Sequence, residues 1–104
     1  MSLHATRSDL HLHEARQRLE HARASRLTQL RALRETGTGT DDDHLLSEQR
    51  AAMERVLKEI EEAVARAEDG TYGTCLGCAT HIPAERLEIL PYARHCVACQ
   101  RRTA

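Results

Sequence analysis

Cys75-Leu76-Gly77-Cys78 and Cys96-Val97-Ala98-Cys99 are the two stretches that decide the fold of this chain, and seventeen residues separate them. Each Cys-x-x-Cys pair presents two thiolates from one tight turn, and two such pairs at this spacing are typical of a four-cysteine zinc site. The alternatives are disulfides, buried free thiols or a redox pair. The redox pair is disfavoured because no βαβ pattern surrounds the motif. We expect Cys75, Cys78, Cys96 and Cys99 to bind one structural zinc ion, with no open position for catalysis.

Other residues near the cysteines fit a small module built around this ion. His81 and His95 are the other candidate ligands, and the symmetry of the two cysteine pairs makes them bystanders. Pro83 and Pro91 bracket residues 84–90, which we expect to form a short helix across the back of the site. The metal is expected to stabilise a segment too small to build a core of its own, so a chelator should melt this segment first.

The composition predicts a thin core. The chain has 104 residues, enough for one small domain, and it contains no Phe or Trp. Its only aromatic residues are Tyr72 and Tyr92, and we expect Tyr72 to pack on the cysteine segment. Charged residues make up 30% of the chain and hydrophobic residues, mostly Ala and Leu, 40%. Such a composition is typical of long exposed helices and coiled coils.

Two long helices are predicted from the spacing of apolar residues. Residues 8–35 carry them at three- and four-residue steps, interrupted at Arg26, and residues 43–68 carry a cleaner heptad, with Gly70 well placed to end this second helix. The first set is Leu12, Ala15, Leu19, Ala22, Leu27, Leu30 and Leu33; the second is Leu46, Gln49, Met53, Val56, Ile60, Ala63 and Ala67.

The connection between the helices fixes their direction. Residues 36–44 read Thr-Gly-Thr-Gly-Thr-Asp-Asp-Asp-His, which breaks the helical pattern and then supplies acids to cap a new helix. So short a turn requires antiparallel helices. We therefore expect a mostly α fold. Residues 1–69 form an antiparallel coiled-coil hairpin, roughly 40 Å long, with its acidic turn at 36–44. Residues 70–104 form a zinc finger with a short C-terminal helix.

The charge distribution excludes several classes of function. Residues 1–35 hold seven arginines and four acids, and residues 36–70 hold ten acids and four basic residues. No broad basic field results, which argues against direct sequence-specific binding of DNA.

No apolar run approaches the roughly 20 residues of a membrane span, and no signal peptide is recognisable. We expect a cytoplasmic protein without membrane contact, and no enzyme, since no nucleophile with a base is visible.

The cysteine segment resembles a known family. The run Gly70-Thr-Tyr72-Gly73-Thr-Cys75-Leu-Gly-Cys78, then His81-Ile82-Pro83-Ala-Glu85-Arg86-Leu87, Leu90-Pro91 and Cys96-Val-Ala-Cys99-Gln100, resembles the zinc finger of the DksA/TraR family. The resemblance implies a bacterial transcription regulator, associated with the stringent response, that binds RNA polymerase directly. It further implies that the hairpin enters the secondary channel and alters initiation, often jointly with the alarmone ppGpp.

The same resemblance assigns a role to the turn. Asp41, Asp42 and Asp43 would be the tip acids that approach the catalytic centre of the polymerase, although acids here also suit a plain helix cap. The family's tip pattern is Asp-x-x-Asp-x-Ala, whereas this chain continues His44-Leu45-Leu46. Ala79 stands where the family commonly has glycine, and we expect Gly77 to supply the missing backbone freedom.

A second class of function stays open at this level. A coiled-coil adaptor, or a dimerising structural protein stabilised by zinc, would use the apolar stripe of the hairpin to hold a partner. A polymerase regulator is expected to be a monomer, whereas the adaptor predicts a dimer. These two hypotheses therefore differ in an oligomeric state that can be measured.

Overall fold

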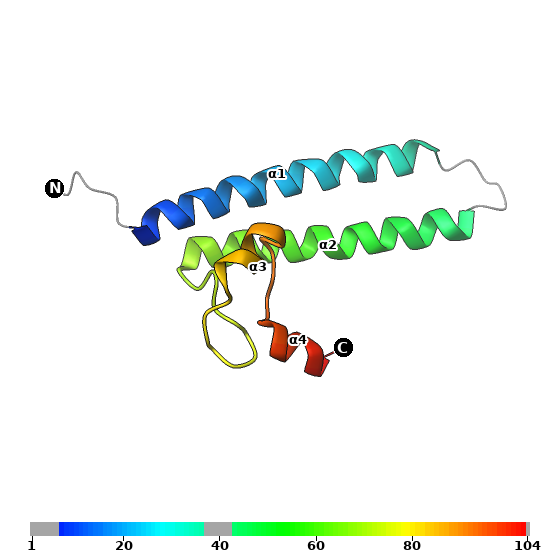
Figure 1. The fold of residues 1–104 in the computed structure, drawn as a ribbon. Coiled ribbons are helices and arrows are strands. Elements are labelled where there is room, and N and C mark those ends of the chain that lie inside the picture. The colour runs from blue at the N-terminus through cyan, green and yellow to red at the C-terminus, as the bar shows by residue number, and fades with distance from the viewer. Residues whose placement is uncertain (1–6, 37–42, 104) are drawn as a thin grey trace.

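The chain folds into two long helices with a small module packed against one end of the pair (Figure 1). The computed structural model describes residues 7–36 and 43–103. Helix α1 spans Arg7–Thr36 and α2 spans Asp43–Asp69, and together they form the hairpin. Residues 70–103, the finger, contain α3 (Ala84–Ile89) and α4 (Val97–Thr103). The expected mostly α fold is confirmed. The division of the chain at Gly70 into two domains stays a prediction.

The buried core of the hairpin lies at the end that carries the finger. Leu19 of α1 and Ile60 and Ala63 of α2 are buried and contact one another, and Ala15 and Ala67 are buried beside them. Small alanines allow the two helices to approach closely, while leucine and isoleucine fill the space between them. We call α1 residues 7–22 together with α2 residues 56–69 the basal half of the hairpin.

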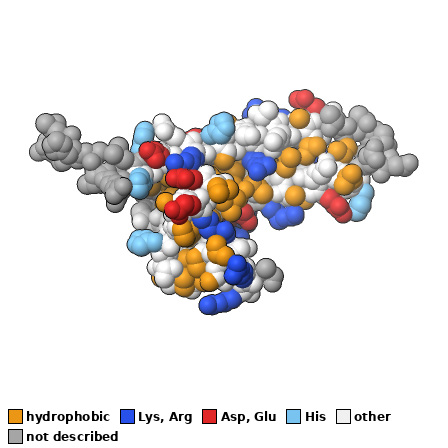
Figure 2. Space-filling model, in the orientation of Figure 1, with side chains coloured by type: hydrophobic (Ala, Val, Ile, Leu, Met, Phe, Trp, Pro, Cys, Tyr) orange, Lys and Arg blue, Asp and Glu red, His pale blue; other side chains and the backbone are white. Residues whose placement is uncertain are grey.

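The distal half, α1 residues 23–36 and α2 residues 43–55, is more loosely packed. Among its described side chains, only Leu30 is buried, while Leu33, Leu46 and Met53 are half-buried. Gln49 occupies a core position of the predicted heptad and is exposed, which interrupts the apolar stripe. Figure 2 shows hydrophobic side chains along the seam between α1 and α2 on this face. Two helices alone cannot cover both sides of such a seam.

Gly70 ends α2, as the sequence predicts. It has a φ of +87°, and the backbone N–H groups of Thr71 and Tyr72 donate to the carbonyl of Arg66 at 3.0 and 3.1 Å. This left-handed glycine with a bond reaching back five residues is a Schellman arrangement. Arg16 of α1 donates to the carbonyl of Ala67 at 3.2 Å and so satisfies a further acceptor of the last turn.

The two tyrosines join the finger to the hairpin. Tyr72 and Tyr92 both pack against the cluster of Leu19, Ile60 and Ala63, and the Tyr72 hydroxyl donates to the carbonyl of Pro91 at 2.7 Å. The sequence analysis expects Tyr72 to pack on the finger; the structure adds that its ring packs against the buried core of the hairpin. Its hydroxyl is bonded to the finger. No helix in the two described ranges is long and apolar enough to cross a membrane.

Candidate metal centre

The first cysteine pair lies in a loop that is closed by backbone hydrogen bonds. Ile82 N–H donates to Gly73 O, and Cys75 N–H donates to Thr80 O, both at 2.8 Å. Thr74 and His81 form an isolated antiparallel bridge between the two ends of this loop. Gly73 has a φ of +85°, a conformation that favours glycine. These bonds fix the turn on which Cys75 and Cys78 sit.

The second cysteine pair is carried by the start of α4. Cys96 immediately precedes the helix, and its carbonyl accepts the first helical bond, from Gln100 N–H at 2.9 Å. Cys99 follows one turn later and is buried. The backbone N–H of Leu76 donates to Arg94 O at 2.9 Å, which holds the first loop beside the segment leading to this pair.

The four thiols converge on one point. All four Sγ atoms lie within 4.8 Å of one another, and Cys78 Sγ is 3.8 Å from Cys96 Sγ. Four sulfurs placed tetrahedrally at ~2.3 Å from a zinc ion are about 3.8 Å apart. The observed positions of the Sγ atoms are therefore compatible with one bound zinc ion. The structure thus brings together all four cysteines that the sequence identifies, in a group able to hold one metal ion.

The environment of the thiols favours thiolate at some positions and opposes it at others. The backbone N–H of Cys96, 3.3 Å from Cys75 Sγ, is the main cause that lowers the pKa of Cys75 to about 6, and Gly77 N–H adds a second donor at 3.4 Å. The Thr80 hydroxyl, 3.0 Å away, lowers the pKa of Cys78. Hydrogen bonds of the Cys99 thiol with the neighbouring sulfurs, Cys75 first, raise the pKa of Cys99 to about 12. A divalent cation bound by the four sulfurs would favour the thiolate form of each cysteine.

The positions around the first turn correct one detail of the sequence analysis. Ala79, and not Gly77, adopts the left-handed conformation, with a φ of +63°. Gly77 has a different role, since a Cβ atom there would lie 3.0 Å from Cys99 Sγ. It is needed for the close approach of the two cysteine turns. The alanine consequently sits in a strained conformation at the position where glycine would sit without strain.

The finger surrounds the thiols with a small apolar core. Cys75, Ile82, Ala93 and Cys99 are buried together, and Leu87, Leu90 and Cys96 pack against them. The predicted helix between the two prolines forms as α3, and Arg86 from it donates to the carbonyl of His95 at 3.0 Å. Among the described residues, the group able to hold a metal ion consists of the four cysteines, and the bystander role of His81 and His95 stays a prediction.

The tip acids cannot be compared with the structure in the same way. Asp41 and Asp42 lie outside the described residues, and Asp43 is the first residue of α2. The nearest described side chains are those of His44 and Glu48, whose exposed groups lie 3.1 Å apart. The expected role of the three aspartates stays a prediction.

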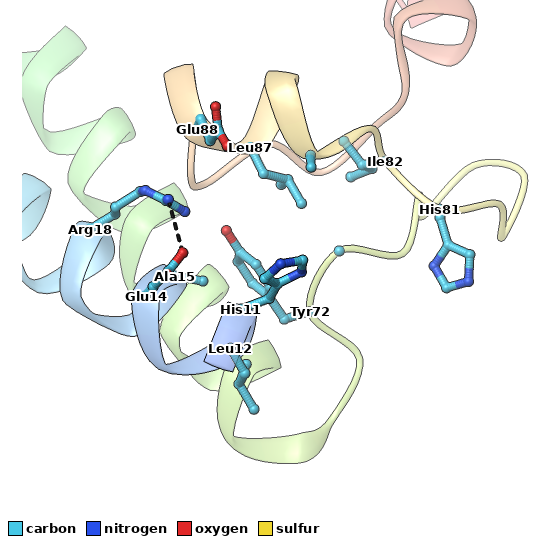
Figure 3. A pocket seen from close by; sticks show the side chains of 12 residues that line it. His11, Leu12, Glu14, Ala15, Arg18, Tyr72, His81, Ile82, Leu87 and Glu88 are labelled. Carbon is cyan, nitrogen blue, oxygen red and sulfur yellow. Dashed lines mark hydrogen bonds and ion pairs between the residues drawn. The ribbon is translucent and has the colours of Figure 1, made fainter. Parts of the chain in front are cut away.

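A cavity of about 310 Å³, which the sequence analysis did not anticipate, separates the finger from α1. Leu12, Ala15 and Leu87 line it, and the ion pair of Glu14 with Arg18 lies at its side (Figure 3). His81 also borders the cavity, but its ring points away from the other labelled side chains. Mixed charge at the rim gives no preference for an anion or a cation.

Comparison with known proteins identifies the finger. Residues 70–103 match the model of the prokaryotic dksA/traR C4-type zinc finger. The chain carries a DksA/TraR zinc finger. The match confirms the resemblance that the sequence indicates, over the same residues. The short helix α4, which contains Cys99, lies within the DksA/TraR finger and ends at Thr103.

Curated relatives share this part of the chain. General stress protein 16O of Bacillus subtilis (strain 168) is 47% identical over 45 residues, which are 43% of this chain and 28% of that protein. An uncharacterized protein of Aquifex aeolicus (strain VF5) is 44% identical over 43 residues, 41% of this chain and 30% of that protein. The matches thus span less than a third of the length of these relatives.

One solved structure is similar over more of the chain. It is that of the transcription factor DksA2 from Pseudomonas aeruginosa, with a TM-score of 0.44 and 29% sequence identity. The similarity covers 88% of this chain and 76% of that one.

Proposed function

We propose that this protein regulates transcription by binding RNA polymerase, with the finger as a fixed base and the hairpin as the part that enters the secondary channel. The observation that carries the proposal is a DksA/TraR finger packed on the base of an antiparallel two-helix hairpin. Such a partner would place the protein in the cytoplasm. No DNA contact and no catalytic step of its own are required.

The metal in this proposal is one structural zinc ion held by Cys75, Cys78, Cys96 and Cys99. Its support is the convergence of the four sulfurs, the spacing of 3.8 Å between two of them, and the N–H donors that favour thiolate at Cys75. Four thiolates complete the coordination of zinc, so the ion would stabilise the finger and leave no site for a substrate.

The proposed contact with the polymerase is made by Asp41, Asp42 and Asp43. Asp43 begins α2, at the end of the hairpin opposite the finger. A narrow hairpin ending in carboxylates can present oxygen ligands near a bound magnesium ion, and magnesium prefers such ligands. The alarmone ppGpp is proposed as a joint effector with polymerase.

Co-elution of the zinc-loaded protein with purified core RNA polymerase tests the proposal. We expect a complex at micromolar protein, and we expect Asp41→Asn/Asp42→Asn/Asp43→Asn to abolish the effect on transcript yield while most of the binding remains. The matched control is Glu61→Gln/Glu62→Gln/Glu68→Gln, which removes the same charge from exposed residues of α2 in the basal half. This control should keep both properties.

The adaptor hypothesis predicts a different outcome of the same experiment. The open seam of the distal half, where Leu45 is 56% exposed, would then be covered by a second copy or another protein. Sedimentation would show a dimer that depends on concentration, and no complex with polymerase would form. That combination of results would reject the polymerase proposal in favour of the adaptor.

A further inference from the structure

One short segment of the finger takes part in two different cores. Along residues 91–94, Ala93 is buried among Cys75, Ile82 and Cys99, whereas its neighbour Tyr92 packs against the basal half of the hairpin. A turn at residues 90–93, in which Ala93 N–H donates to Leu90 O at 3.0 Å, directs these two neighbouring side chains to different sides. The segment therefore lies between the metal centre and the hairpin, and Cys96 follows two residues after its end.

Tyr72 contacts the same hairpin core from the other end of the finger. Its ring packs against the cluster of Leu19, Ile60 and Ala63, and burial is the main cause that raises the pKa of its hydroxyl. The bond of 2.7 Å from this hydroxyl to Pro91 O ties it to the segment that carries Tyr92. The positions of both rings on the hairpin thus depend on the backbone of residues 91–94.

Arg94 makes a third contact between the finger and the hairpin. The carbonyl of Arg94 accepts the N–H of Leu76, the residue after the first cysteine, while the side chain of Arg94 lies 3.3 Å from Glu59 of α2. A single residue thus contacts the first cysteine turn through its backbone and the hairpin through its guanidinium. All three contacts depend on the position of residues 91–94.

We propose that zinc binding controls the packing of the basal half of the hairpin, through Tyr72, Tyr92 and Arg94. The inference rests on the zinc site of the proposed function, and it does not depend on polymerase binding. Without the ion, two of the four residues in the buried cluster of the finger are free cysteines, and this cluster is too small to fix residues 91–94. Both rings then leave the hairpin, and Leu19, Ile60 and Ala63 lose their cover.

Chelation of zinc should then affect more of the chain than the finger. The sequence alone predicts that the finger melts before the hairpin. The structure instead predicts that the finger and the basal half loosen in one step, because they share the two aromatic rings. The zinc ion would then determine whether the hairpin is presented as a rigid rod, which makes the protein responsive to the supply of zinc.

The full chain offers a direct probe, because Tyr72 and Tyr92 are its only aromatic residues of the Phe, Trp and Tyr set. We would compare the zinc-loaded protein, the same protein after chelation, and the protein after zinc is restored. Acrylamide quenching of tyrosine fluorescence reports the exposure of the rings, and hydrogen exchange reports the amides of α1 and α2. Chelation should expose the rings and speed exchange near Leu19 and Ile60 by roughly ten- to a hundredfold. Zinc should reverse both changes.

Variants separate the role of the rings from that of the metal. Tyr72→Ala/Tyr92→Ala, with zinc still bound, should speed exchange in the basal half as chelation does, and chelation should then add little. The matched control is Leu45→Ala/Ile89→Ala, which removes two side chains that are 56% and 84% exposed. This control should leave exchange in the basal half unchanged, and chelation should act on it as on the parent protein.

The outcomes distinguish this inference from the proposed function. Stoichiometric zinc whose removal leaves the tyrosines and the basal amides unchanged would overturn the coupling, and the polymerase proposal would stand. Coupling without a polymerase complex would support this inference and reject the proposed function. A protein that binds no zinc at all would overturn the metal site and the coupling together.

Discussion

The two halves of the hairpin are built from the same kinds of residues but differ in how they are held. In the basal half, Leu19, Ile60 and Ala63 are buried, and finger side chains cover them. In the distal half, Leu30 is the one buried residue among the described side chains, and the ion pair of Arg34 with Glu54 spans 3.7 Å between exposed groups. An exposed pair of this kind contributes little to stability.

The difference shows where the stability of this chain originates. A two-helix hairpin has one seam and no third element to cover it, so it is stable only where another part of the chain packs on it. The finger does so for the basal half. The distal half is expected to open locally at low cost in free energy, a property common to elements that bind partners.

The largest effect is expected from loss of the metal site. Cys75→Ser removes a buried sulfur that accepts two backbone N–H bonds, and we expect the finger to unfold and the bound zinc to fall from about one ion per chain to none. Structural zinc contributes about 10–16 kcal/mol of binding free energy in small fingers. Metal analysis and circular dichroism check this result. His81→Ala is the control and should retain its zinc. A parent protein that is fully folded without bound metal would contradict the assignment.

Core truncation compares the two halves directly. Leu19→Ala deletes a side chain of 0% exposure, and we expect it to lower the free energy of unfolding by about 2–5 kcal/mol. Leu46→Ala makes the same chemical change at a half-buried position of the distal half and should cost about 1 kcal/mol or less. Urea unfolding followed by circular dichroism measures both values. Equal losses at the two positions would show that the halves are equally well packed.

A smaller effect is expected at the joint. Tyr72→Phe keeps the ring and removes the bond to Pro91 O, which should cost about 0.5–1.5 kcal/mol. The raised pKa of Tyr72 means that the folded state holds the phenolic proton more tightly than the unfolded state. Its contribution is therefore full below pH ~10 and lost as the pH rises further. Unfolding curves across this range should show an alkaline loss in the parent protein that is reduced in Tyr72→Phe.

The smallest change should be a gain in stability. Ala79→Gly places glycine at a φ of +63° and should raise the free energy of unfolding by about 0.5–1 kcal/mol, because relief of strain exceeds the added entropy of the unfolded chain. Gly70→Ala is the opposite change, at a φ of +87° with open space around it, and should cost about 1 kcal/mol. Thermal unfolding of both variants checks the signs. A loss of stability in Ala79→Gly would contradict the strain argument.

Much of this fold follows from local patterns. The cysteine spacing predicts which four side chains converge, because each pair sits on one turn whose geometry depends on neighbouring residues. The apolar spacing predicts both helices to within a residue or two of their bounds, and Gly70 ends α2 as expected from its freedom to adopt a positive φ. The sequence by itself therefore determined the hairpin, the finger and the order in which they occur.

The tertiary structure alone decided how the finger and the hairpin meet. Tyr72 and Tyr92 cover Leu19 and Ile60 through contacts between residues far apart in the chain, and no local pattern encodes such contacts. The same holds for Gly77, whose small size is required only because Cys99 approaches it from the second cysteine turn. The spacing of apolar residues indicates which face of a helix is apolar. Which neighbour buries that face depends on the packing of the whole chain.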